Sequence, residues 1–87
     1  MWFRSLGTPP SLRREDLSDS IALFDRAYAD TFVLEPFAAT VLRHAEAMEA
    51  GSLRALADSL PTAPESVDLE QAAQDLAHLG FLRLCDD

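Results

Sequence analysis

The spacing of hydrophobic residues divides the chain into a β-rich first part, residues 1–35, and a helical second part, residues 36–82. In residues 30–35 (DTFVLE), Thr, Phe and Val favour a pleated surface, and the pair Thr31 and Val33 alternates with Phe32 and Leu34, which predicts a strand. Residues 20–25 (SIALFD) and 11–16 (SLRRED) are two further candidate strands, the last weakened by its charges. This order favours an α+β fold with an N-terminal antiparallel sheet of about three strands, followed by helices.

Three helices are predicted after the strands. Pro36 ends the preceding strand and begins the first helix, because proline lacks the N–H of a central strand but fits a first helical turn. Helical spacing continues over about residues 36–50, with Phe37 on the apolar stripe and Gly51 as the C-cap. Ser52 is the predicted N-cap of a short second helix that Pro61 ends.

The third helix is predicted over about residues 69–79, where Asp68 and Gln71 resemble a capping box and Gly80 closes the helix. Its apolar residues cover roughly 160° of a helical wheel, wider than the ~100° of an ordinary surface helix. Either a small domain buries most of this helix, or one edge covers the core while the other forms part of a groove. Residues 81–85 (FLRLC) would add a short strand or an extended tail.

The composition is that of a small, folded, acidic protein. Of its 87 residues, 48% are hydrophobic and 25% are charged, as in globular domains. The net charge of -8 would repel DNA and anionic membranes, so we expect no nucleic acid and no membrane partner, and a basic peptide or protein surface as the complement. The single cysteine and the lack of a signal sequence or membrane span predict a cytoplasmic protein.

No catalytic constellation is recognised in the sequence. His44 and His78 lie on different predicted helices, and one cysteine cannot build a Cys-based zinc site. Three scattered glycines form no phosphate-binding loop, and no serine lies in a nucleophile elbow. We therefore expect no enzyme activity, no cofactor and no metal.

Strands followed by three helices also resemble a winged-helix DNA reader. However, the loop over residues 61–67 is longer than a helix-turn-helix turn, and residues 55–82 contain no lysine or arginine. Strand addition fits better, since an edge strand offers unpaired backbone N–H and C=O groups to an extended peptide. Residues 30–35 would be that edge, although the sequence leaves open whether this strand is central. The third helix would lie beside it.

Four motifs carry a family resemblance: Trp2 at the start, DSIALFD (19–25), DTFVLEPFAATVL (30–42) and DLAHLGFL (75–82). Together they resemble the PqqD-like family, small winged-helix modules known as RiPP recognition elements. The resemblance is closest to the branch associated with HPr-kinase-related systems, in which the strand ends in Leu-Asp/Glu-Pro before a helix that begins with paired alanines. The sequence departs from that branch at Ala29 and Phe32, where glycine and histidine are expected.

The resemblance implies that residues 1–87 form one peptide-binding domain without catalytic activity. Such a module binds the leader segment of a precursor peptide, between the third strand and the third helix, and presents it to a modifying enzyme or an HPr-kinase-related protein. Backbone pairing would come from the strand and side-chain contacts from the helix, with Asp75 facing a basic peptide side chain. The site residues expected on this basis are Thr31, Phe32, Val33, Leu34, Ala72, Asp75, Leu76 and Leu79.

Two alternatives remain open from the sequence. The first is an adaptor that docks on a kinase-like or transferase partner without binding free peptides. The second, ranked last, is a winged-helix DNA-binding regulator. Exchange of the weak first strand between two copies would in addition give a homodimer.

Overall fold

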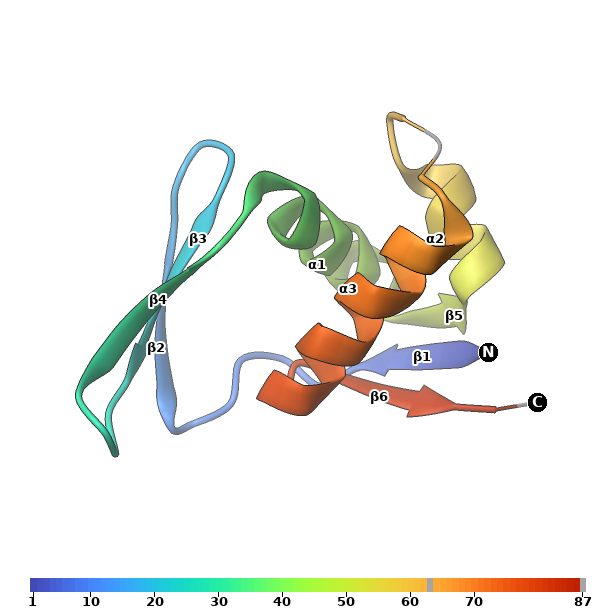
Figure 1. Ribbon diagram of the computed structural model, residues 1–87. Helices are drawn as coiled ribbons and strands as arrows, with labels where there is room; N and C mark the ends of the chain where they lie inside the picture. The colour runs from blue at the N-terminus through green and yellow to red at the C-terminus, as the bar shows by residue number, and fades with distance from the viewer. Residues whose placement is uncertain (63, 87) are drawn as a thin grey trace.

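The computed structural model describes residues 1–62 and 64–86, which form six β-strands and three α-helices (Figure 1). The strands build two antiparallel three-stranded sheets, with the orders β2-β3-β4 and β5-β1-β6. In chain order the elements are β1 (Trp2–Ser5), β2 (Leu12–Asp16), β3 (Ile21–Asp25), β4 (Asp30–Leu34), α1 (Pro36–Met48), β5 (Ala50–Ser52), α2 (Leu53–Ser59), α3 (Ser66–Leu79) and β6 (Leu82–Cys85). The α+β class and the three helices are as predicted.

The sheet β2-β3-β4 contains the three strands that the sequence predicts. It stands to one side of the helices in Figure 1, and β4 leads directly into α1. Ile21 lies opposite Leu34 at the end near the helices, and Asp25 lies opposite Asp30 at the far end. The connection over residues 26–29 closes a hairpin. In it, the Ala27 and Tyr28 N–H groups donate to the Asp25 carboxylate.

The second sheet was not predicted as a sheet, because only its strand β6 has a counterpart in the sequence analysis. Strand β1 lies between β5 and β6, and Phe3 is paired with Gly51 on one side and Leu84 on the other. The partners of β1 are far away in sequence, and strands of three or four residues are too short for alternation to be recognised. Residues near both chain ends therefore lie side by side, as Figure 1 shows.

The hydrophobic core lies where the helices meet both sheets. Ile21 and Leu23 of β3 are fully buried, and so are Leu42, Leu76 and Phe81 from the helical part. Helix α3 packs across α1 and against β6. Most of the wide apolar arc of α3 is therefore core, which is the simpler of the two interpretations that the sequence allowed.

Three predicted helix boundaries are confirmed. Pro36 is the first residue of α1, and the Ser52 side chain accepts a hydrogen bond from the Ala55 N–H at 3.0 Å, which caps α2. Gly80 ends α3 in the left-handed conformation, with φ of 97°. Each is a position at which local chemistry alone decides the backbone.

Two predicted caps are wrong. Helix α1 ends before Gly51, with Glu49 at a φ of 70° as its C-cap, because the next residues pair with β1. Helix α3 begins at Ser66 rather than near residue 69, with Glu65 as N-cap, so Asp68 lies inside the first turn instead of in a capping box. There its carboxylate lies near the positive end of the helix dipole, which stabilises the helix.

Candidate functional site

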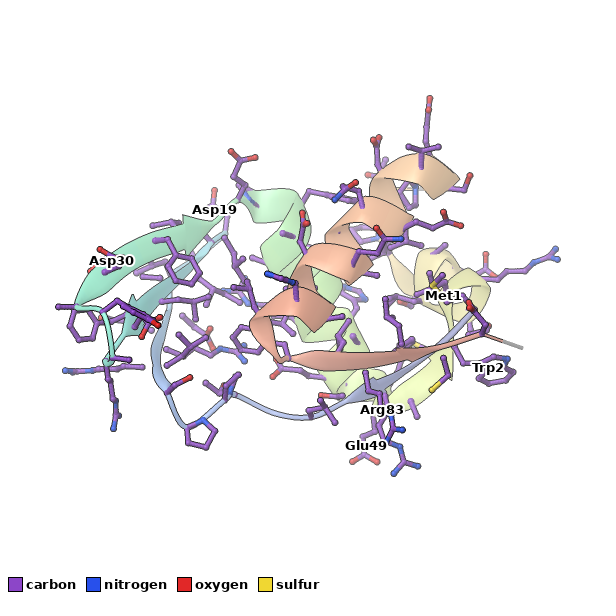
Figure 2. The ribbon with its side chains drawn as sticks, turned by 60° about the horizontal axis from the view of Figure 1, so that its bottom comes forward. Met1, Trp2, Asp19, Asp30, Glu49 and Arg83 are labelled. Atoms are coloured by element: carbon purple, nitrogen blue, oxygen red, sulfur yellow. The ribbon has the colours of Figure 1, made fainter. Side chains whose placement is uncertain are left out.

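Strand β4 is an edge of its sheet, which answers the question that the sequence left open. It pairs with β3 on one side, and within the described residues no strand pairs with it on the other. In Figure 2, Asp30 marks the end of β4 remote from the helices, and Asp19 lies near the end at which β4 passes into α1. Strand β4 therefore runs from this remote end toward the helical part of the molecule.

The hydrogen bonds at the two ends of the β2-β3 hairpin fix which backbone groups point toward β2. The Leu17 N–H donates to the Ser20 carbonyl at 2.9 Å, next to the tight turn. At the other end, the Arg26 N–H donates to the Ser11 carbonyl at 3.0 Å. Because bonded and non-bonded pairs alternate along an antiparallel ladder, the even-numbered residues of β3, such as Ala22, direct their backbone groups to β2.

The same alternation determines the free edge of β4. Ala22 is opposite Val33, and Phe24 is opposite Thr31. Since the backbone groups of these two β3 residues face β2, the pairs are the non-hydrogen-bonded ones of the β3-β4 ladder. The N–H and C=O groups of Thr31 and Val33 thus point away from β3, toward the open edge. These are the groups that an added strand would pair with.

The side chains of β4 alternate between the core and solvent. Leu34 is 8% exposed, and Phe32 is half-buried against the core. Thr31 and Val33 are exposed on the opposite face, with Val33 at 55%. Of the four predicted strand residues, two therefore combine free backbone groups with exposed side chains, and two hold the strand against the core.

A groove of about 800 Å³ begins where β4 ends. Its lining comes from Glu35 and the start of α1, from the α2–α3 loop, and from one side of α3 between Asp68 and Asp75. Phe37 lies in that first turn with 41% of its surface exposed, although its spacing predicted a core residue. The exposed ring and three prolines of the lining (Pro36, Pro61, Pro64) make much of the groove surface apolar.

One stripe of α3 faces this groove: Asp68, Gln71, Ala72 and Asp75. These residues have the i, i+3, i+4, i+7 spacing of one helix face. The Gln71 side chain donates to the Asp75 carboxylate at 3.0 Å and so orients it. The groove face of α3 is therefore more acidic than the apolar rim expected from the sequence.

The structure separates the four predicted helix residues. Ala72 and Asp75 line the groove, but Leu76 is fully buried in the core, and Leu79 is half-buried against it. In this arrangement Leu76 cannot offer its side chain to a ligand, because no part of it reaches solvent. It supports α3 from beneath.

Sequence reasoning missed most of the groove: Glu35, Phe37, Glu65, Asp68 and the prolines of the α2–α3 loop. Two signals were available. Four of its residues are acids (Glu35, Glu65, Asp68 and Asp75), and none of the described lining residues is basic. Pro36 was recognised as a helix start, and the first turn that follows it projects beyond the core.

Two ties hold the sheet β2-β3-β4 on α1 and so fix β4 relative to the groove. The Arg14 guanidinium donates to both carboxylate oxygens of Glu46, at 2.6 and 2.9 Å. The Arg43 guanidinium donates to the Leu17 and Ser20 carbonyls at 2.7 and 2.9 Å. Both arginines bridge β2 or its turn to α1, so the edge and the groove are set by the same helix.

Neither a metal centre nor a membrane span is found in the part of the chain that the structure describes. Over residues 1–62 and 64–86, no three His, Cys, Asp or Glu side chains are grouped so as to hold a metal ion. No helix in the same ranges has the length and apolar character needed to cross a bilayer.

Comparison with known proteins identifies the fold but not the family. No protein-family model matches the sequence, and no curated protein matches it. Among solved structures, the fold matches that of TbiB1 in complex with the TbiA(beta) leader peptide, with a TM-score of 0.65 and 14% sequence identity. The match covers 94% of this chain and 100% of the TbiB1 chain. The chain therefore shares the fold of a protein solved with a leader peptide.

Proposed function

We propose that this protein is a non-catalytic peptide chaperone, which binds the leader segment of a ribosomally made precursor peptide as an added strand on β4. The observation that carries the proposal is the free edge of β4, where Thr31 and Val33 direct their N–H and C=O groups outward. An edge strand without charged side chains at its centre is open to pairing with another chain. TbiB1, with the same fold, was solved with a leader peptide.

The bound peptide would use the predicted site in a modified form. Backbone pairing comes from Thr31 and Val33, and side-chain contacts come from the exposed Val33 and Asp75. Ala72 is 6% exposed and contributes only as part of the groove lining. The buried or half-buried residues Phe32, Leu34, Leu76 and Leu79 position these elements. Membership of the PqqD-like family and of its HPr-kinase-related branch remains part of this proposal.

A modifying enzyme would then dock elsewhere on the surface, and the outer face of the sheet β5-β1-β6 is suited to it. Trp2 is 51% exposed on this face, and Arg4 lies directly opposite Arg83. Figure 2 shows Trp2 and Arg83 on the same end of the molecule, remote from Asp30. Opposed like charges destabilise a sheet, so an acidic partner would relieve their repulsion. This face also favours the adaptor function as the second candidate.

An amide-resolved NMR titration of the full chain tests the proposal, with the short peptides encoded beside its gene as probes. A leader peptide should shift the amide signals of residues 30–35 and of residues 68–75, because these line the edge and the groove. If no such peptide shifts them at concentrations up to about a millimolar, leader binding is refuted. Association with an enzyme that Arg4→Glu abolishes would then support the adaptor.

A further inference from the structure

The groove next to β4 differs in chemistry from the edge itself. The edge offers backbone groups, whereas the groove offers four carboxylates around an apolar surface, at Glu35, Glu65, Asp68 and Asp75. Within the described lining no basic side chain neutralises them. Gln71 occupies one oxygen of Asp75 and leaves the second to a ligand. A partner that covers this surface needs positive charge as well as an apolar side chain.

The groove is continuous with the edge strand. Glu35 is the residue that follows β4, and it lies in the groove lining. A chain paired with Thr31 and Val33 therefore extends past Leu34 directly into the groove. Antiparallel pairing is the more stable arrangement per residue, and in that direction the entering residues are those on the N-terminal side of the paired segment.

The spacing of the α3 carboxylates matches an extended peptide. Asp68 and Asp75 lie on one face of α3 and are seven positions apart, which corresponds to about 10 Å along the helix axis. On an extended chain, residues i and i+2 share one face and lie about 7 Å apart, and the length of two arginine side chains covers the remaining few ångströms. Two basic side chains separated by one apolar residue thus reach both carboxylates while the apolar side chain is directed elsewhere, and the exposed ring of Phe37 is the surface available to it.

We propose that the groove between the first turn of α1 and the Asp68–Asp75 stripe of α3 is a second subsite, which selects a basic and apolar segment immediately N-terminal to the strand-forming segment of the bound peptide. The subsite rests on the proposed strand addition to β4. It supplies the sequence selectivity that backbone pairing lacks, since every peptide carries the same N–H and C=O groups.

Three synthetic octapeptides test the subsite: RLRLTVTV, the block-reversed TVTVRLRL, and ELELTVTV. Each is titrated against the full chain, and the amide signals of Thr31, Val33, Phe37 and Asp75 are followed. All three should shift the two β4 signals. Only the first should also shift the two groove signals, and it should bind about tenfold more tightly than the others, the effect of two or three partly exposed ion pairs.

The outcomes separate the two proposals. Equal affinity of all three peptides with shifts confined to β4 overturns the subsite and leaves strand addition standing. No shift on β4 from any of the three overturns both. Shifts in the groove without shifts on β4 overturn the continuity on which the subsite depends.

A pair of variants adds a matched control. Asp68→Asn with Asp75→Asn removes two of the four groove charges with little change of shape, and it should clearly reduce the preference for RLRLTVTV over ELELTVTV, while Glu35 and Glu65 retain part of it. Asp58→Asn removes an exposed charge of α2 outside the groove and should leave the preference unchanged. A preference that is undiminished in the double variant overturns the subsite.

Discussion

The two edges of the sheet β2-β3-β4 are opposite in chemistry. Strand β2 has the sequence LRRED, so four of its five residues are charged. Strand β4 has the sequence DTFVL, and its only charge lies at the end remote from the helices. Both strands have an open side, but charged side chains discourage a further strand from pairing, and β4 has none at its centre.

One outward backbone group of the β2 edge is already bonded within the chain itself. The Leu12 N–H, which faces away from β3, donates to the Pro9 carbonyl at 3.0 Å. Arg14 on the same strand is held by Glu46 of α1 and by Asp16. The β2 edge therefore attaches the sheet to α1, while the β4 edge remains open to an added strand.

Proline substitution on each edge should give the largest effect. Val33→Pro removes an outward N–H from β4 and leaves the bonds to β3 intact, because Val33 belongs to a non-hydrogen-bonded pair. A peptide carbonyl left without its hydrogen-bond donor reduces the binding free energy by about 1–3 kcal/mol, so peptide affinity should fall by about 5- to 150-fold. Isothermal titration calorimetry, with a leader peptide that binds the unchanged protein, measures this loss of affinity.

Asp16→Pro is the matched control for Val33→Pro, since Asp16 also directs its N–H away from β3. It should leave peptide affinity within about twofold of the unchanged protein. Circular dichroism establishes that both variants are folded. Equal losses of affinity in the two folded variants would show that the β4 edge has no special role.

The tie of β2 to α1 should affect folding stability rather than binding. Arg14→Met removes a bidentate, partly buried salt bridge to Glu46, and we expect the free energy of unfolding to fall by about 1–2 kcal/mol. The hydrogen bond to Glu46 raises the pKa of Arg14 above its ordinary value. The stability that comes from this shift is present below the unfolded-state pKa, so it persists across the experimental pH range.

Arg13→Met serves as the comparison for Arg14→Met, because Arg13 is exposed on the same strand. Its effect on the unfolding free energy should stay within about 0.5 kcal/mol. Urea denaturation of the three proteins gives the values. If Arg14→Met unfolds at the same urea concentration as Arg13→Met, the ion pair does not fasten the edge.

Local chemistry explains which parts of the fold could be predicted. The three strands of the first sheet, the Pro36 helix start and the Gly80 helix end all depend on nearby residues, and each was predicted. Strands β1 and β5 depend on each other across most of the first half of the chain, so their short segments carry no local signal. The wrong C-cap at Gly51 follows from the same missed pairing.

The candidate site could be predicted only in part, for the same reason. The β-propensity of residues 30–35 indicated the strand, and the register, which places the outward groups at Thr31 and Val33, needed the bonds at the ends of the β2-β3 hairpin. Helical spacing also indicated that Leu76 and Asp75 lie on different parts of α3. Helical spacing could not show which face of α3 packs against α1. The packing of α3 on α1 places Leu76 in the core.

The turn before β4 should give the smallest effect, and in the stabilising direction. Ala29 has a φ of 55°, a left-handed conformation that costs a residue with a Cβ about 1–2 kcal/mol, whereas glycine adopts it freely. Glycine adds about 0.4–1 kcal/mol of unfolded-state entropy. The balance predicts that Ala29→Gly raises the unfolding free energy by about 0.5–1 kcal/mol.

This change also separates the stability of β4 from its capacity to bind. Ala29→Gly should raise the melting temperature by a few degrees for a domain of this size, and calorimetry measures the shift. Glu49→Gly, at a φ of 70° after α1, relieves the same strain far from the edge and should raise it similarly. Since neither substitution alters the outward groups of Thr31 and Val33, peptide affinity should stay constant in both. A loss of affinity in Ala29→Gly alone would mean that the turn, and not only the free edge, takes part in binding.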